Sequence, residues 1–515
     1  MPPISKRVGF FPLKTWEGEH KSYKQEVEGY YSFRVDSPIN DQARLDSYNA
    51  ATADLQGLIA TAIDRGKTLR ALGSSWSLSK VGMTNHHLIT TKALTNAFHF
   101  AQDQVDPSYP DAAALRFVEC GNSMADLNRY LFSDGLSLKA SGSNNGQTLV
   151  GAVSTGTHGS AFRFGACPDF VVGIHLITGS SKHVYLERAS RPVVAPSIAQ
   201  KLGAELIRDD TLFNSALVSF GSFGIIHGLM VETRKLFVLD VHRSWEKFDR
   251  GLKTAISSFD FSGMQLPGGE AKLYHFEVFF NPNEGTPPKE ACVILMFEND
   301  WSPDYVPPRW EGGSAGLGAG ALEVMGELVG AIPSPLNELV KPLLNSQVRD
   351  KFAPDKKKAI IRDLFRGEKT RGKTLSAGMG VPMNRSLDAI AVAFEAYEKF
   401  GSVLPLLIST RFVRATQAVL GFTRFDPTCV LEIDAVNTGK IRSFLEKVWE
   451  GLEKARIPFT LHWGKFNFYL TKTSVKGMYG TALDTWKASR ETLFEDAEAA
   501  KVFSNSFTRS LGLTT

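Results

Sequence analysis

The sequence predicts a protein of alternating helices and apolar strands, of the α/β or α+β class. Segments with apolar residues at helical spacing alternate with short apolar runs between residues 40 and 239. The chain has 515 residues, which allows two to four domains at roughly 150 residues each. Its 43% apolar and 22% charged content is typical of a soluble globular protein.

The first helix is expected over residues 40–66, where apolar residues recur at helical spacing and Gly66 provides a stop. The run TLRAL that follows, residues 68–72, is expected to be a short strand. A second cycle comes next, with the strand Leu115–Cys120 and a helix over 124–134. Ser123 and Asp126 form a capping pair for that helix, and Gly135 ends it.

Further strands are expected at 170–178 and within 224–239. From about residue 237 the pattern of residue types changes. The runs YHFEVFFNP (274–282) and CVLEIDAV (429–436) are typical of strands in a second sheet. Residues 301–385 form an unusual insertion, apolar but broken by Gly and Pro, and then basic. Two interpretations stay open: a pair of packed helices, or an apolar lid that touches an apolar substrate or a membrane.

Charge and cysteine content exclude several classes of function. A net charge of +4 over this length gives no reason to expect a nucleic-acid partner. No apolar run reaches the ~18 residues of a membrane span, and the first residues lack a signal-peptide core, so a cytoplasmic protein is expected. The histidines and cysteines show no metal-ligand spacing. The four cysteines are widely spaced: Cys120, Cys167, Cys292 and Cys429.

Two clusters of glycine and hydroxyl residues are the main functional signal. One is ALGSSWS, residues 71–77, and the richer one is Ser141–Ser160, with five Gly and seven Ser or Thr. Neither matches the P-loop or the G-x-G-x-x-G pattern. Such segments present backbone N–H groups and hydroxyls to an anion or a ring, so two of them suit a dinucleotide such as FAD. The alternative is a plain Ser/Gly-rich surface loop.

Four separated segments, in order, resemble the vanillyl-alcohol-oxidase/PCMH family of FAD-binding oxidoreductases, closest to its aldonolactone and alditol oxidase branch. ALGSSWS resembles the pyrophosphate loop, and GQTLVGAVSTGTHGS resembles the second flavin loop. Residues 212–232 resemble the segment that closes the FAD domain. LHWGK, residues 461–465, resembles the H-W-x-K signature near the C-terminus.

The resemblance implies a two-domain α+β fold. An FAD-binding domain would take residues 1–236, and a cap domain with an antiparallel sheet would take 237–455, including the insertion 301–385. The segment 456–515 would return to the FAD site. YHFEVFFNP resembles the first strand of the cap.

The resemblance also implies which residues bind FAD. Many relatives carry in the first loop a His that bonds covalently to the flavin, and this chain has Trp76 there. A Trp cannot make that bond and the second loop has no cysteine, so we expect non-covalent FAD with Trp76 against the isoalloxazine edge. The expected FAD-binding residues are Leu72, Gly73, Ser74, Ser75, Trp76, Ser77, Gln147, Thr148, Val150, Gly151, Ser154, Thr155, Gly156, His158, Gly159, Ile225, Ile226 and Lys465.

Candidate catalytic residues follow from the same resemblance and from the chemistry. Transfer of a hydride to flavin N5 gathers negative charge near flavin N1, which Lys465 and His462 are suited to balance. Arg411 fits the Arg of the family's Glu-x-Arg pair, but Ser409 stands at the Glu position. The next strand supplies Glu432 and Asp434, which point the same way.

Glu432 is therefore the candidate base or substrate orienter, and Glu277 is a weaker one. His158 is expected to fix its loop by bonding neighbouring backbone rather than to act in catalysis.

The function these observations favour is oxidation of an alcohol by FAD, with a small-molecule alcohol as substrate and O2 or another acceptor. Gly151, where the family places a small residue beside the flavin, leaves room for O2 and favours an oxidase that forms H2O2. The substrate is either a sugar lactone or polyol, or a bulkier alcohol such as a sterol. Alternatives are a dehydrogenase, a polyprenyl-phosphate-sugar oxidoreductase at a membrane surface, and a non-catalytic flavin-binding protein.

Overall fold

The computed structural model describes residues 5–35, 38, 40–309, 341–365 and 374–515. The two predicted helices begin at the polar residues that precede them. α1 (Asp41–Asp64) is capped by Asn40, whose side chain accepts a hydrogen bond from the N–H of Ala43. α2 (Met124–Ser133) is capped by Ser123, which accepts from the N–H of Asp126. Both helices are confirmed to within two residues at their ends.

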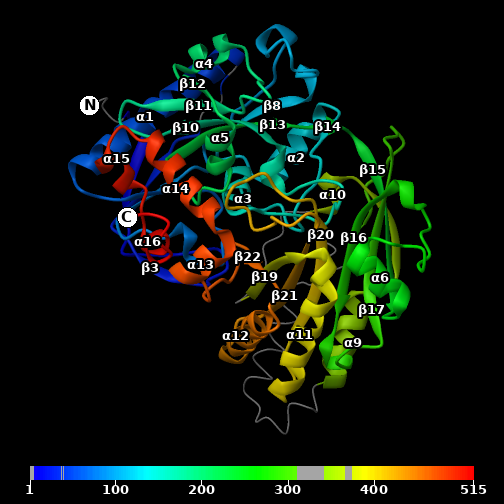
Figure 1. The fold of residues 1–515 in the computed structure, drawn as a ribbon. Helices are drawn as coiled ribbons and strands as arrows, with labels where there is room; N and C mark the ends of the chain where they lie inside the picture. Colours follow the sequence, from blue (N-terminus) through cyan, green and yellow to red (C-terminus); the bar gives the residue numbers. More distant parts are fainter. Residues whose placement is uncertain (1–4, 36–37, 39, 310–340, 366–373) are drawn as a thin grey trace.

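The two larger sheets of the described first half of the chain have four and six strands (Figure 1). The four-stranded sheet has the order β1 (Val8–Pro12), β4 (Gly29–Phe33), β6 (His87–Thr90), β5 (Leu69–Leu72). The six-stranded sheet has the order β12 (Glu205–Arg208), β11 (His183–Glu187), β10 (Val171–Ile177), β13 (Ile225–Glu232), β8 (Leu115–Glu119), β7 (Ala97–Phe98). The smaller elements of this half are β2 (Thr15–Glu17), β3 (Lys24–Glu26), β9 (Leu136–Ser137), β14 (Arg234–Lys235), α3 (Leu149–Thr155), α4 (Pro196–Leu202) and α5 (Asp210–Leu217).

A third sheet of eight strands follows in the second half. Its order is β18 (Asp355–Ala359), β15 (Phe237–Lys247), β17 (Glu290–Asp300), β16 (Leu273–Phe280), β20 (Leu406–Val413), β21 (Thr428–Val436), β19 (Thr374–Pro382), β22 (Thr460–Leu461). All of its neighbouring strands are antiparallel. The expected first strand of this sheet, YHFEVFFNP, is β16 and comes second, because β15 precedes it along the chain.

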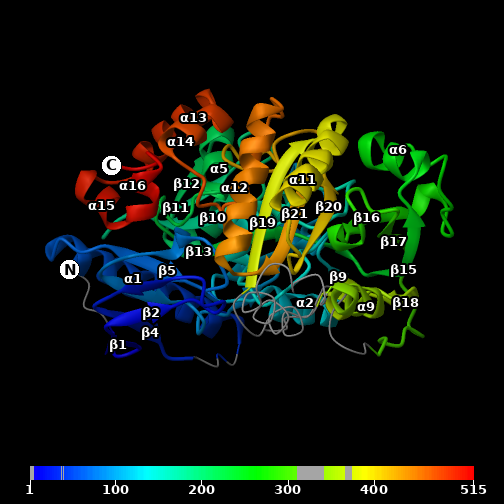
Figure 2. The same cartoon turned by 90° about the horizontal axis from the view of Figure 1, so that it is seen from below.

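One face of the eight-stranded sheet is apolar and packs against α6 (Arg250–Ser258), α11 (Ser386–Phe400) and α12 (Gly439–Lys454). Figures 1 and 2 show α11 and α12 lying along the sheet. Side chains alternate across a strand, so Leu431 and Ile433 of β21 join this core and Glu432 faces the other way. The opposite, polar face therefore looks toward the first half of the chain.

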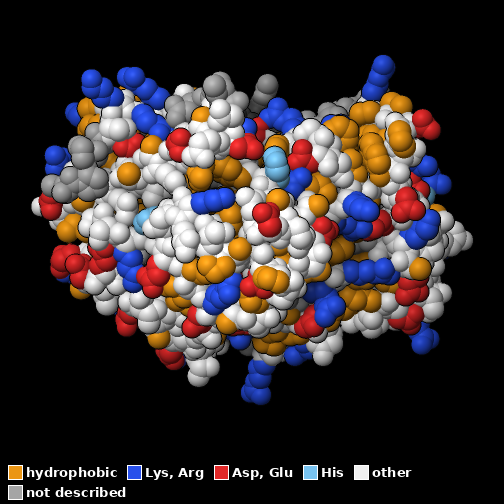
Figure 3. All heavy atoms as spheres, turned by 90° about the horizontal axis from the view of Figure 1, so that it is seen from above, with side chains coloured by type: hydrophobic (Ala, Val, Ile, Leu, Met, Phe, Trp, Pro, Cys, Tyr) orange, Lys and Arg blue, Asp and Glu red, His pale blue; other side chains and the backbone are white. Residues whose placement is uncertain are grey.

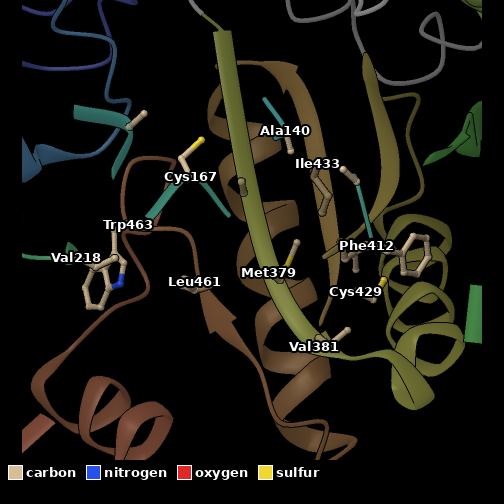
Figure 4. Packing of buried hydrophobic residues seen from close by; sticks show 14 of the residues in the cluster. Ala140, Cys167, Val218, Met379, Val381, Phe412, Cys429, Ile433, Leu461 and Trp463 are labelled. Carbon is tan, nitrogen blue, oxygen red and sulfur yellow. The ribbon is translucent and has the colours of Figure 1, made fainter. Parts of the chain in front are cut away.

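The hydrophobic core runs without a break from the first half into the large sheet. Figure 4 shows Val218 and Trp463 on one side, and Met379 and Ile433 on the other. Trp463 is fully buried and donates from its indole N–H to the carbonyl of Leu420, 2.7 Å away. The two halves are thus joined by shared core rather than by a linker alone.

The last helices of the chain return to the first half, next to α1 and α5 (Figure 1). These helices are α13 (Lys472–Tyr479), α14 (Thr481–Leu493), α15 (Ala497–Val502) and α16 (Ser506–Ser510).

The insertion 301–385 is described in part. Its described elements are α9 (Lys341–Lys351), the edge strand β18 and α10 (Ile361–Leu364). Exposed lysines on β18, Lys356 and Lys358, protect this edge from pairing with another chain. The apolar residues 310–340 and residues 366–373 lie outside the described residues, so both interpretations of the insertion stay predictions.

The described residues can be searched for membrane spans, metal sites, disulfides and strongly charged surfaces. In this part of the chain no helix is long and apolar enough to cross a membrane. No group of three or more metal-ligating side chains occurs in the same residues. The four cysteines are buried and unpaired. On the face seen in Figure 3, basic and acidic side chains are intermixed rather than gathered into one field.

Candidate active site

A row of polar side chains crosses the polar face of the eight-stranded sheet. Glu277 on β16 pairs with Arg411 on β20, and Ser409 on β20 pairs with Glu432 on β21. Gly378 on β19 pairs in turn with Glu432. Residues that pair directly across antiparallel strands share a face, so the register alone brings these groups together.

Arg411 and Glu432 are the centre of a buried ionic cluster. Arg411 Nε lies 2.6 Å from Glu277 Oε1, and its Nη1 lies 2.8 Å from Glu432 Oε2. The other oxygen of Glu432, Oε1, accepts from Lys465 Nζ. Glu432 therefore joins the arginine of one strand to the lysine that follows β22. Of the predicted residues, Arg411 and Lys465 thus each contact Glu432 directly.

The surroundings of Glu432, Glu277 and Asp434 shift the pKa values of these carboxylates in different directions. Burial works to raise the pKa of Glu432, but Arg411 and Lys465 outweigh it and hold this pKa well below the ordinary value. Glu277 follows the same pattern: burial opposes ionisation, and Arg411 and His275 lower its pKa. Asp434 differs, because burial dominates and raises its pKa. One strand thus carries a firmly ionised Glu and a more basic Asp, two residues apart.

Two histidines close the site on the side of the second loop. His158 bonds the carbonyl of Gly159 through Nδ1, at 2.9 Å, as expected for a residue that fixes its loop. Its Nε2 also lies 3.4 Å from Glu432 Oε1, a contact that sequence reasoning missed. His462 accepts from the N–H of Gly464 through Nδ1, and burial lowers its pKa well below the ordinary value. His462 is therefore neutral, so Lys465 and Arg411 carry the positive charge here.

The H-W-G-K turn touches the second glycine-rich loop and the residues that directly follow the first. The N–H of Leu78 donates to the carbonyl of Gly464, and Ser79 Oγ donates to the carbonyl of Trp463. A Cβ on Gly464 would lie 3.1 Å from Thr155 Oγ1, so this glycine permits close packing on α3. Segments that are far apart in sequence therefore meet beside the sheet face.

The second loop contains more regular structure than its composition suggests. Leu149–Thr155 forms α3, capped by Thr148 and ended by Gly156, whose φ is +76°. Leu149 and Val153 are buried against the core. Gly151 and the half-buried Val150 lie on the open side of the helix, consistent with a surface that faces a cofactor.

The first loop packs directly against the second. A Cβ on Gly73 would overlap the side chain of Thr148, and a Cβ on Gly146 would overlap the indole of Trp76. Trp76 also meets the ring of His20 edge-on, with 5.2 Å between ring centroids. The indole thus lies between the N-terminal hairpin and the second loop, and its predicted contact with a flavin ring stays a prediction.

Polar atoms beside these loops fit the FAD that the resemblance implies. Buried atoms without a hydrogen-bond partner among the described residues include Gln147 Oε1, Ser219 Oγ, and Nε and Nη2 of Arg70. Gln147 belongs to the second loop, and Arg70 is on β5, which leads into the first. Buried polar groups are normally paired, so these atoms mark places where a ligand completes the hydrogen bonding. The predicted residues Ile225 and Ile226 lie buried at the start of β13.

The second loop is also anchored to the sheet next to the ionic cluster. The Ser160 hydroxyl donates to the carbonyl of Phe276 and accepts from the N–H of Phe412, at the point where β16 and β20 separate. Phe276 and Phe412 directly adjoin Glu277 and Arg411 in sequence. This bond sets the distance between the second loop and the polar face.

Comparison with known proteins identifies an FAD binding domain in this chain. Residues 49–187 match the family model described as an FAD binding domain. The chain is 24% identical over 458 residues to the L-gulono-1,4-lactone dehydrogenase of Mycobacterium tuberculosis, covering 89% of this chain and 93% of that protein. It is 30% identical over 177 residues to the D-arabinono-1,4-lactone oxidase of Yarrowia lipolytica, which is 34% of this chain but only 29% of that protein.

Solved structures share the whole architecture. A cholesterol oxidase from Brevibacterium sterolicum superimposes with a TM-score of 0.67 at 12% identity, covering 99% of both chains. A chitooligosaccharide oxidase gives a TM-score of 0.60 at 10% identity, covering 95% of this chain and 93% of that one. At such low identities these structures support only the fold, which is that of an α+β flavoprotein with an antiparallel sheet. The match to the FAD binding domain indicates that the cofactor is FAD. The chain therefore contains an FAD binding domain at residues 49–187, and as a whole it has the fold that these oxidases share.

Proposed function

We propose that this FAD-dependent oxidoreductase oxidises the CH–OH group of a sugar lactone or polyol bound on the polar face of the eight-stranded sheet. The observation that supports it most is the buried chain Arg411–Glu432–Lys465, which lies beside the second flavin loop. Bound FAD supplies the acceptor for the hydride. The residues of the chain bind and orient the alcohol and take up its hydroxyl proton.

Lys465 and Arg411 are suited to bind the substrate and to balance negative charge. Both cations are held in place by the fully buried carboxylate of Glu432, where their charges are screened less by water than on the surface. A lactone carbonyl or a set of hydroxyls accepts hydrogen bonds from such groups. Glu432 orients both cations and stays ionised.

Asp434 is the better candidate to take up the hydroxyl proton. It lies on the same face as Glu432, two residues along β21, and its raised pKa makes it the more basic carboxylate. Of the two roles expected for Glu432, base or substrate orienter, we propose the second, because with a pKa held low by two cations Glu432 is a weak proton acceptor. We therefore assign Glu432 a positioning role.

The electron acceptor is proposed to be O2, which gives H2O2. The support is Gly151, which is exposed on α3: outside the helix's own backbone, Thr148 Oγ1 is the one atom of the described residues within 4 Å of an added Cβ. A dehydrogenase would reduce another acceptor instead. The test is the amount of peroxide formed per substrate oxidised: about one supports an oxidase, and none identifies a dehydrogenase.

The substrate class is tested by mixing the oxygen-free protein with sugar lactones, polyols, simple alcohols and sterols. Bleaching of the flavin absorbance by lactones or polyols supports the proposal. Bleaching by sterols alone would favour the bulkier alcohol. Flavin that none of these compounds reduces would favour the non-catalytic alternative.

A further inference from the structure

Arg70 has a position that the oxidation chemistry does not explain. It lies on β5 of the four-stranded sheet, three residues before Gly73, with only 3% of its surface exposed. Its Nη1 donates to the carbonyl of Phe220, in the turn that leads into β13 of the six-stranded sheet. The guanidinium thus spans from the strand that carries the first flavin loop to the segment predicted to close the FAD domain.

Two of the three nitrogens of this guanidinium, Nε and Nη2, have no hydrogen-bond partner among the described residues. A buried cation with unmet donors is costly, because its lost hydration is not replaced. Burial also lowers the pKa of Arg70 to about 10. The neighbouring Ser219 Oγ is likewise buried and unpaired, so unmet polar atoms gather at this turn.

A second arginine in the same region provides the contrast. Arg490 on α14 is also buried, at 5% exposure, and burial lowers its pKa to about 10 as well. It reaches the same turn, where its Nε donates to the carbonyl of Ser222 at 2.8 Å. Its Nη2 donates to the carbonyl of Ala500 and to Ser504 Oγ. Protein groups therefore accept the hydrogen bonds of Arg490, whereas two nitrogens of Arg70 have no acceptor among the described residues.

We propose that Arg70 binds the pyrophosphate of FAD through Nε and Nη2. Phosphate oxygens match the fork of a guanidinium and supply the negative charge that this site lacks. The position fits, since the first flavin loop begins directly after β5. The proposal rests on FAD as the cofactor and is independent of which alcohol is oxidised.

The test compares Arg70→Met with Arg490→Met in the full-length holoenzyme. Release of FAD on dilution, followed by flavin fluorescence, gives the dissociation constant. ADP, which carries the pyrophosphate but no flavin ring, is added as a competitor. We expect Arg70→Met to weaken both FAD and ADP at least about tenfold and to flatten the salt dependence of binding. Arg490→Met should melt at a lower temperature than the wild type but bind both ligands with near wild-type affinity.

Other outcomes would overturn the proposal. If Arg70→Met binds FAD with the affinity of the wild type, Nε and Nη2 of Arg70 donate hydrogen bonds only to buried water. If FAD weakens but ADP does not, Arg70 contacts the flavin ring rather than the pyrophosphate. Should Arg70→Met fail to fold, Arg70→Lys provides the test: it keeps the charge but not the fork, so FAD affinity should fall several-fold with the salt dependence retained. Unchanged affinity in this variant would also refute the assignment.

Discussion

Two acidic residues of β21, Glu432 and Asp434, occupy the same face but have opposite shifts of pKa. Glu432 touches both Arg411 and Lys465, and these cations outweigh the effect of burial. For Asp434, burial outweighs the effect of Lys465 and Arg411, and the charge of Glu432 acts in the same direction as burial, so its pKa rises. Environments that separate two pKa values in this way assign the orienting role to one group and the proton-accepting role to the other.

Asp434→Asn tests this division. A base works only when ionised, so kcat/KM of the wild type should rise with pH through a pKa above 3.8, the ordinary value for Asp. Asp434→Asn should remove this acid limb and lower kcat at least about tenfold, with little change in FAD content. The measurement is the pH profile of kcat/KM for both proteins. An unchanged acid limb in the variant would assign the proton to another group.

The presence of Trp76 in the first loop leads us to expect FAD that is held without a covalent bond. The indole N–H is only a hydrogen-bond donor and does not form a bond to a flavin. Cys167, whose N–H donates to the carbonyl of Thr157 in the second loop, is buried, and burial raises its pKa to about 12, which leaves it almost without reactive thiolate. Acid precipitation of the holoenzyme should therefore leave yellow flavin in the supernatant. Flavin that stays with the pellet would show a covalent link.

At the scale of secondary-structure elements, Gly378 of β19 makes room for the ionic cluster. A Cβ at this position would lie 3.3 Å from His462 Cβ, 3.5 Å from Lys465 Cδ and 3.7 Å from Glu432 Oε1. The strand brings no side chain of its own here, so the lysine from beyond β22 can cross over it to reach Glu432.

Substitutions at Gly378 should reduce activity in proportion to their size. Gly378→Ala is expected to lower kcat a few-fold, and Gly378→Val at least about tenfold, because the added side chain displaces Lys465. The fold should persist in both variants, since valine is a favourable residue in a β-strand. Steady-state kinetics and melting temperatures are compared with those of Gly439→Ala, where an added Cβ meets nothing within 4 Å. Wild-type activity in Gly378→Val would show that the contact of Lys465 with Glu432 is not needed.

Elements with clear end signals could be predicted from the sequence, and contacts set by strand register could not. The helices α1 and α2 follow from their caps and apolar spacing, and the strands from their apolar runs. The short helix α3 was missed because its Gly, Ser and Thr content is typical of a loop. Glu277 was a weak candidate because only the pairing of β16 with β20 places it against Arg411. Arg70 was missed because a single arginine on a strand gives no signal without its surroundings.

At the scale of the whole molecule, a buried polar chain in the first half links stability to pH. His175 of β10 is fully buried, with Nδ1 2.6 Å from Tyr48 Oη and Nε2 2.8 Å from His183 Nδ1. His227 and Glu119 lie beside them, joined by a 3.0 Å contact. Burial, with a smaller effect of the neighbouring histidines, lowers the pKa of His175 well below 6.5.

This arrangement should make the protein less stable below pH ~6.5. The unfolded chain then binds a proton at residue 175 that the folded chain does not, so the free energy of unfolding falls by up to about 1.4 kcal/mol per pH unit for this group. His462 contributes with the same sign, so the comparison with His175→Gln isolates one residue. Urea midpoints between pH 5 and 8 should fall less steeply in the variant. Equal slopes in both proteins would show that His175 is protonated in the fold.

The central claim is that Glu432 holds Arg411 and Lys465 where the alcohol is oxidised, and oxygen-free flavin reduction by the best lactone or polyol tests it most directly. The comparison is between the wild type, Glu432→Gln and a control, Glu446→Gln, whose residue is exposed on α12. We expect Glu432→Gln to reduce its flavin at least about tenfold more slowly, with unchanged FAD content, because both cations lose their charged partner. The control should match the wild type. Flavin reduction at the wild-type rate in Glu432→Gln would contradict this account of the site.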